Sequence, residues 1–132
     1  NVGEEEGKGN LLAQATYPLL KENKHINFIG NIEGRDVFID KADVMVCEGF
    51  TGNVILKLAE SLYDISQRQK IKNEYFDRFN FENYGGTPVL GVAKPVIIGH
   101  GISGEKAFKN MILVARKMIE KDVLGRMKEE LV

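Results

Sequence analysis

Three glycine-rich turns in this sequence carry polar side chains that could bind an anion. In the first, Lys8 stands between Gly7 and Gly9, where a flexible backbone could direct its ammonium group toward a phosphate. The second is Gly49-Phe-Thr-Gly-Asn53, and the third runs from Gly99 to Gly104. Each precedes a stretch with helical spacing, and a helix start offers unpaired N–H groups and partial positive charge. The predicted phosphate-binding residues are Gly7, Gly9, Gly49, Thr51, Gly52, His100, Gly101 and Ser103.

Each of these residues also has an ordinary structural interpretation. Glycine-rich turns after strands are usually only turns, and the sequence contains neither a Walker A motif nor an intact Rossmann fingerprint. Lys8 follows three glutamates and could be a solvated loop charge, while Asn53 could cap the next helix. His100 could be a general base or a histidine fixed by backbone hydrogen bonds. Cys47 is interpreted as a buried, small apolar residue at the end of a strand rather than as a nucleophile.

The segments around the turns predict both helices and strands. Helices are expected from about Asn10, after Asn53 and after Gly104, and Pro18 should kink or shorten the first. The apolar face of the second helix is predicted to be Val54, Leu58, Leu62 and Ile65. The buried face of the last helix is predicted to be Ala107, Met111, Val114 or Ala115, and Met118. Short apolar runs predict strands at Ile26–Ile32, Ala42–Cys47, Val89–Val92 and Pro95–Ile98.

Strands separated by helices favour a single α/β domain with a mostly parallel sheet flanked by helices. In such a sheet, ligands bind beyond the carboxyl ends of the strands, where turns lead into helices. If the strands are parallel, the glycine-rich turns lie along the same edge. We therefore expect Lys8 and Asn53 to contribute to one anion-binding site.

Composition excludes several other classes of function. The formal net charge of −1 gives no overall attraction to nucleic acid, so the aromatic residues from Tyr75 to Phe81 are interpreted as core or dimer contacts. The single cysteine fits a reducing cytoplasm, and Lys94 interrupts the longest apolar run. We expect a cytoplasmic protein without a metal site or cofactor. The chain starts at Asn1 rather than at methionine, which indicates a fragment.

Several blocks of the sequence, taken together and in order, resemble the phosphate acyltransferases of fatty acid and phospholipid synthesis. The blocks are residues 1–10, 27–36, 42–53, 84–86 and 100–101. The resemblance implies transfer of an acyl chain from acyl carrier protein to inorganic phosphate, which gives acyl phosphate for glycerolipid synthesis. It implies a homodimer with a Rossmann-like fold related to isocitrate and isopropylmalate dehydrogenases. It also implies that this chain is the C-terminal portion of a longer enzyme whose N-terminal part is absent.

The resemblance assigns catalytic roles to two residues. Lys8, in Gly-Lys-Gly-Asn, and Asn53, in Gly-Phe-Thr-Gly-Asn, match family positions that are important for activity. When phosphate attacks a thioester, negative charge builds on the carbonyl oxygen. Lys8 could hold the phosphate or neutralise this charge, and Asn53 could donate to the oxyanion or orient the nucleophile. Direct attack is expected, because no activated serine or cysteine nucleophile is evident.

The sequence departs from the family pattern at two places. Leu11 stands where the family often has glutamate, which affects the start of the helix. The stretch between Val54 and Tyr84 is also shorter than usual. In the family it carries a helical hairpin for dimer and peripheral membrane contact, which residues 66–83 would represent in truncated or incomplete form. Whether this protein has lost part of the hairpin or the given chain lacks it is left open.

Two other functions are compatible with the sequence. A nucleotide-dependent oxidoreductase on the related dehydrogenase fold would require a ribose-binding acid and a glycine fingerprint, neither of which is seen. A non-catalytic dimerisation and docking module for acyl carrier protein would require a basic surface, since that carrier is acidic. Arg68, Lys70 and Lys72 could provide this surface.

Overall fold

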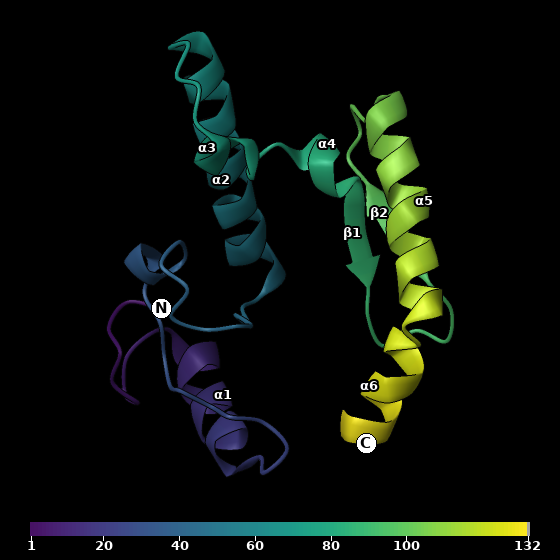
Figure 1. Ribbon diagram of the computed structural model, residues 1–132. Helices are drawn as coiled ribbons and strands as arrows, with labels where there is room; N and C mark the ends of the chain where they lie inside the picture. The colour runs from purple at the N-terminus through teal and green to yellow at the C-terminus, as the bar shows by residue number, and fades with distance from the viewer. Residues whose placement is uncertain (132) are drawn as a thin grey trace. The chain divides into compact units, whose positions relative to one another are not determined.

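The computed structural model describes residues 1–131, which form two compact units (Figure 1). The first unit is Asn1–Val46, and the second begins at Cys47. Both helices and strands are present, as expected for a chain of the α/β type. Within residues 1–131, no helix combines the length and the apolar character that crossing a bilayer requires.

The first unit contains helix α1 (Leu11–Glu22), the short 3-10 helix η1 (Gly34–Asp36) and loops. The predicted helix start is confirmed, because the side chain of Asn10 accepts a hydrogen bond from Ala13 N at 2.9 Å. The helix continues for four residues beyond Pro18. Tyr17 packs edge-on against Phe28, with ring centroids 5.0 Å apart, and so fixes the following loop to the helix.

The prediction of strands at residues 26–32 and 42–47 is wrong for the described residues. Residues 26–32 and 42–47 lie in irregular structure, and Val44 and Val46 are exposed. A strand needs a neighbour to pair with its backbone N–H and C=O groups, and no such neighbour lies beside either segment within residues 1–131. The apolar pattern therefore did not suffice to form a strand.

The second unit contains a long helix, two short helices, a hairpin and two final helices. These elements are α2 (Gly49–Arg68), α3 (Glu74–Asp77), α4 (Phe81–Tyr84), β1 (Gly86–Val89), β2 (Val96–Gly99), α5 (Glu105–Glu120) and α6 (Val123–Leu131). Strands β1 and β2 are antiparallel, with Gly86 opposite Gly99 and Val89 opposite Val96. The predicted mostly parallel sheet is therefore wrong for the described residues. The six residues between the strands are too few for the crossover that a parallel pair needs.

Helix α5 packs against the hairpin and against α4 (Figure 1). Its predicted buried face is confirmed: Ala107 and Met118 are buried, and Met111 is half-buried. Gly85 has φ +78°, and a Cβ there would lie 2.4 Å from Met111 N. A Cβ on Gly86 would lie 2.5 Å from Ile98 O. These two glycines let the chain pass closely between α5 and β2.

The predicted buried face of α2 is mostly wrong. Leu62 is half-buried, but Val54, Leu58 and Ile65 are each at least 50% exposed. The helical period is correct, because all these residues belong to one 20-residue helix. Within the described residues, no element packs over that face as α5 packs over the hairpin.

Candidate functional site

The predicted turn Gly49–Asn53 forms the first turn of α2, and the protein's own carboxylate caps it. Glu48 accepts hydrogen bonds from Phe50 N at 2.6 Å, from Thr51 N at 2.7 Å and from the Thr51 hydroxyl. The Thr51 hydroxyl, followed by these backbone N–H groups, lowers the pKa of Glu48 below the ordinary glutamate value. Gly52 N donates to Glu48 O at 3.0 Å. An anion that used this helix start would have to replace the Glu48 side chain.

Asn53 lies inside α2 and is exposed, so the interpretation of this residue as the helix cap is wrong. Within residues 1–131 its side-chain amide makes no hydrogen bond, so the amide is available to a ligand. Cys47 is also exposed, rather than buried as expected. Its sulfur would lie 3.1 Å from a Cβ on Gly52, so glycine leaves room for the thiol beside the helix start.

The third turn leads into α5, and its helix start lacks a side-chain cap. Gly104 is the N-cap and makes no side-chain hydrogen bond. The turn is closed by Ser103 N, which donates to His100 O at 2.9 Å. The Ser103 hydroxyl oxygen is buried and has no hydrogen-bond partner within the described residues. A buried hydroxyl without a hydrogen-bond partner lowers the stability of the fold. A ligand oxygen that bonded to Ser103 would remove this cost.

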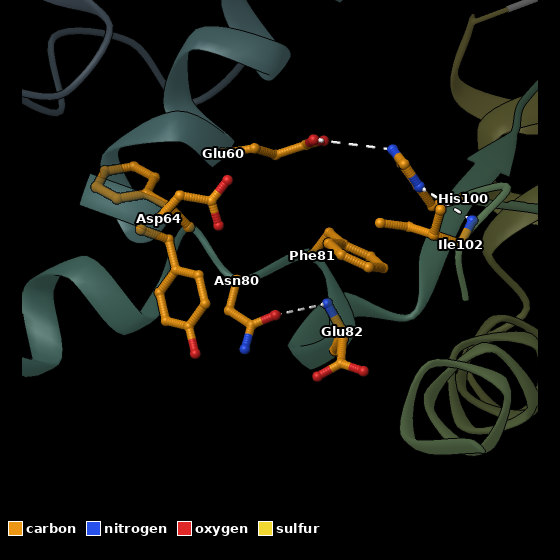
Figure 2. Close-up of a pocket in the computed structure, with 9 residues that line it drawn as sticks. Glu60, Asp64, Asn80, Phe81, Glu82, His100 and Ile102 are labelled. Carbon is orange, nitrogen blue, oxygen red and sulfur yellow. Dashed lines mark hydrogen bonds and ion pairs between the residues drawn. The ribbon is translucent and has the colours of Figure 1, made fainter. Parts of the chain in front are cut away.

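His100 joins this turn to α2. Its Nε2 lies 2.6 Å from Lys57 Nζ and 3.9 Å from a carboxylate oxygen of Glu60. Lys57 also contacts that carboxylate, at 2.8 Å. The imidazole ring stacks at a tilt on Phe81, with centroids 4.8 Å apart. Figure 2 shows His100 facing Glu60 across the space between the two elements.

A cavity of about 210 Å³ lies beside His100 and is bordered by α2 and α4 (Figure 2). Three carboxylates line it, those of Glu60, Asp64 and Glu82, together with the aromatic residues Tyr63, Phe79 and Phe81. Like charges repel, so this cavity disfavours phosphate. The turn before α5 also borders this cavity through Ile102, and a Glu82 carboxylate oxygen would lie 3.8 Å from a Cβ on Gly104.

The first turn contains Lys8 in the first unit. Gly9 has φ +94°, and a Cβ there would lie 2.2 Å from the Asn1 amide oxygen. The Asn1 side chain in turn donates to Lys8 O at 3.1 Å. Gly9 is therefore required by the turn itself. Gly7, by contrast, has open space around a Cβ, as does Gly101.

The glutamates that precede Lys8 are largely engaged by other cations. Glu4 pairs with Lys41 at 2.6 Å, and Glu6 pairs with Lys21 at 2.9 Å. Lys41 lowers the pKa of Glu4, and the Glu4 carboxylate raises that of Lys41. Lys8 is exposed, and its ammonium has no ion pair within residues 1–131. The charge of Lys8 is thus not neutralised by its acidic neighbours.

Asn53 and His100 belong to the second unit, and Lys8 belongs to the first. That Lys8 and Asn53 contribute to one site stays a prediction. Sequence reasoning missed Lys57, Glu60 and the capping role of Glu48. A signal for Lys57 was present, because it lies four residues after Asn53 and therefore on the same face of α2.

Comparison with known proteins gives consistent matches. The family described as "Fatty acid synthesis protein" matches residues 1–71 and 65–126. A phosphate acyltransferase of Dictyoglomus turgidum is 44% identical over 151 residues, covering 99% of this chain and 45% of that protein. One of Clostridium perfringens is 42% identical over 150 residues, covering 99% and 44%. One of Aquifex aeolicus is 46% identical over 142 residues, covering 92% and 42%.

The chain spans under half the length of these relatives. It has 132 residues against 151 aligned positions in the first relative, so at least 19 positions (151 − 132) lack a counterpart here. The two segments that match the family overlap at residues 65–71, around the end of α2. The overlap lies within the stretch between Val54 and Tyr84, which the sequence indicates is shorter here than in the family.

Proposed function

Because this chain belongs to the fatty acid synthesis protein family, we propose that it is the C-terminal part of a phosphate acyltransferase. The relatives that cover nearly all of the chain carry that name. In the proposed reaction, inorganic phosphate attacks the thioester carbonyl of a fatty acyl group on acyl carrier protein. The carbon–sulfur bond breaks, the carrier thiol leaves, and acyl phosphate forms for phospholipid synthesis.

The observation that supports a phosphate site most directly is the start of α5. Its cap residue Gly104 supplies no side chain, and the neighbouring Ser103 hydroxyl is buried without a partner. We propose that phosphate binds here, with His100, Gly101 and Ser103 in contact with it. A helix start has the correct sign of charge for this anion.

Lys8 and Asn53 are the proposed catalytic residues. The unpaired ammonium of Lys8 suits either a phosphate or the developing oxyanion. The free amide of Asn53 is one turn of α2 away from Lys57 and can donate to the carbonyl oxygen or orient phosphate. Gly7, Gly9, Gly49, Thr51 and Gly52 then shape the two turns that present these side chains.

The complete protein is proposed to be a cytoplasmic homodimer with a Rossmann-like, dehydrogenase-related fold. In that fold, segments 26–32 and 42–47 would pair with strands supplied by the rest of the protein. Residues 66–83 are proposed to be a shortened hairpin for dimer and peripheral membrane contact. Arg68, Lys70 and Lys72 are exposed at the end of α2, which supports docking of an acidic acyl carrier protein there.

The test is formation of acyl phosphate from acyl carrier protein and phosphate by the complete protein. Lys8→Ala and Asn53→Ala are expected to lower turnover by a factor of about 100 or more. Lys109→Ala and Gln67→Ala are matched controls, because they remove an exposed ammonium and an exposed amide elsewhere. Unchanged turnover in both Lys8→Ala and Asn53→Ala, with intact folding, would remove these residues from the mechanism.

A further inference from the structure

The turn that carries Lys8 is attached to a distant part of the first unit. Gly3 N donates a hydrogen bond to Glu33 Oε1 at 2.8 Å, across 30 positions of the sequence. The next residue, Glu4, accepts a hydrogen bond from Lys41 Nζ at 2.6 Å. Two consecutive residues of the turn are therefore held by the segment that contains η1 and Lys41.

Gly3 lies against the stem of the Lys8 side chain. It has φ +97°, and a Cβ there would lie 2.8 Å from Lys8 Cγ and 3.3 Å from Lys8 Cβ. The backbone is held as well, because Glu5 O accepts from Lys8 N at 3.0 Å and from the Asn31 side chain at 3.0 Å. An exposed lysine has many rotamers of similar energy, and a group packed against its first carbons removes some of them. The position of Gly3 therefore limits where the Lys8 ammonium lies.

Asp36 holds both groups that attach the turn. It is only 5% exposed, and its Oδ2 accepts from Glu33 N at 2.8 Å and from Lys41 Nζ at 3.1 Å. The bond from Glu33 N is the largest cause of a lowered pKa of Asp36, and Lys41 lowers this pKa further. The second carboxylate oxygen of Glu33 pairs with Arg35 at 2.5 Å. These contacts leave Glu33 Oε1 directed at Gly3 N.

We propose that Glu33 is a positioning residue for Lys8 and acts through Gly3. Asp36 orients Glu33 by accepting from its backbone N–H group. The placement of the Lys8 side chain does not depend on which reaction the protein catalyses. Its consequence for catalysis rests on the proposed function, in which Lys8 contacts phosphate or the developing oxyanion.

The first test measures the motion of the Lys8 side chain directly. Complete protein labelled with carbon-13 in its lysines is examined by NMR relaxation, with Lys8→Arg to assign the signals. We expect Cγ of Lys8 to be more ordered than Cγ of Lys24, an exposed lysine in the loop after α1, and to lose this order in Glu33→Leu. Glu22→Leu is the matched control, because it removes an exposed carboxylate elsewhere in the same unit. A Lys8 side chain as mobile as that of Lys24 in the wild type would overturn the proposal.

A second variant displaces the side chain without removing Glu33. Gly3→Ala places a Cβ 2.8 Å from Lys8 Cγ, so either the Lys8 rotamer or the turn has to change. We expect shifted Lys8 side-chain signals in Gly3→Ala. Gly34→Ala is the matched control and should leave them unchanged, because nothing lies within 4 Å of its Cβ. Unchanged Lys8 signals in Gly3→Ala would contradict a route through Gly3.

The third test measures steady-state kinetics of acyl phosphate formation by the complete protein. We expect Glu33→Leu to lower kcat/KM for phosphate about tenfold, with little change in KM for the acyl donor. Glu33→Gln should restore most of the loss, because its amide oxygen still accepts from Gly3 N. Equal losses in Glu33→Gln and Glu33→Leu would refute the role of this hydrogen bond.

A double variant separates positioning of Lys8 from a general loss of stability. If Glu33 acts through Lys8, adding Glu33→Leu to Lys8→Ala should lower kcat/KM by less than about twofold further. A further tenfold loss would overturn the proposal, because Glu33 would then act independently of Lys8. Failure of the wild type to form acyl phosphate would refute the proposed function and leave the NMR results standing.

Discussion

Helices α2 and α5 both begin at glycine-rich turns, but only at α2 does a side chain accept hydrogen bonds from the first backbone N–H groups. At α2, the Glu48 carboxylate accepts from Phe50 N and Thr51 N. At α5, Gly104 offers no side chain, and the Ser103 hydroxyl beside it has no partner within residues 1–131. At α2 a side-chain carboxylate thus accepts from the N–H groups of the helix start, whereas at α5 no side chain caps the helix, although Glu105 lies in its first turn.

The difference shows that glycine content does not by itself identify an anion site. Both turns are rich in glycine, but the residue at the N-cap is glutamate in one and glycine in the other. Glycine allows close approach, but only an unsatisfied donor gives a phosphate something to bind. The comparison therefore favours the start of α5 over that of α2 for the proposed phosphate site, and Asn53, on α2, is proposed to act on the reacting carbonyl or the nucleophile.

The largest expected effect comes from disturbing the packing that places the start of α5. Gly85→Ala puts a Cβ 2.4 Å from Met111 N at φ +78°, so backbone must move. We expect a loss of about 3 kcal/mol or more in the free energy of unfolding. Gly101→Ala is the matched control, because nothing lies within 4 Å of its Cβ. Thermal and denaturant unfolding measure both. Equal stability of the two variants would show that the close approach at Gly85 is not needed.

Ser103→Ala should weaken phosphate binding without lowering the free energy of unfolding. Removing a buried hydroxyl that has no partner should leave the free energy of unfolding unchanged or raise it by up to about 1 kcal/mol. KM for phosphate should nevertheless rise about tenfold if the hydroxyl binds the anion. In Ser66→Ala, a buried hydroxyl that donates to Tyr63 O at 2.7 Å is lost, so stability should fall by about 1 kcal/mol. A Ser103→Ala enzyme with unchanged KM would place phosphate elsewhere.

Features that depend on neighbouring residues in the chain were predictable from the sequence. The Asn10 cap depends on a bond to a residue three positions away, and it is confirmed. The stripe that includes Ala107 and Met118 is confirmed because the nearby hairpin covers it. The antiparallel pairing of β1 and β2 was also within reach, since six residues cannot make a parallel crossover.

Features that depend on a partner elsewhere were not predictable. Residues 26–32 and 42–47 have the composition of strands, yet a strand exists only when another strand pairs with it. The apolar face of α2 has the correct period, but whether Leu58 is buried depends on what packs over it. In the site, the family resemblance indicated Asn53 and His100, whereas the bond from Lys57 to His100 joins residues 43 positions apart and needed the structure.

A smaller effect is expected at the start of α2. Glu48→Gln keeps the shape of the cap but removes its charge, so the melting temperature should fall by a few degrees. KM for phosphate should not change if the anion binds at α5. A lower KM in Glu48→Gln would mean that phosphate competes with Glu48 at α2, and the assignment of the two helix starts would be reversed. Glu129→Gln, which removes an exposed carboxylate on α6 outside both caps, is the control.

The smallest expected effect concerns how acid lowers the melting temperature through the Glu48 cap of α2, compared between wild type and Glu48→Gln. Hydrogen bonds from Thr51 and Phe50 lower the folded-state pKa of Glu48 below its ordinary value of 4.5. The carboxylate therefore stabilises the fold above that value, and the contribution is lost as the pH falls through the lowered pKa. Glu4 and Asp36 also have lowered pKa values, but they are the same in wild type and Glu48→Gln, so their effect cancels in the difference. We expect the melting temperatures of the two proteins to converge between neutral pH and about pH 3. A gap that stays constant would show that the charge of Glu48 contributes nothing to the cap, and the contrast between the two helix starts would then be one of shape rather than of electrostatics.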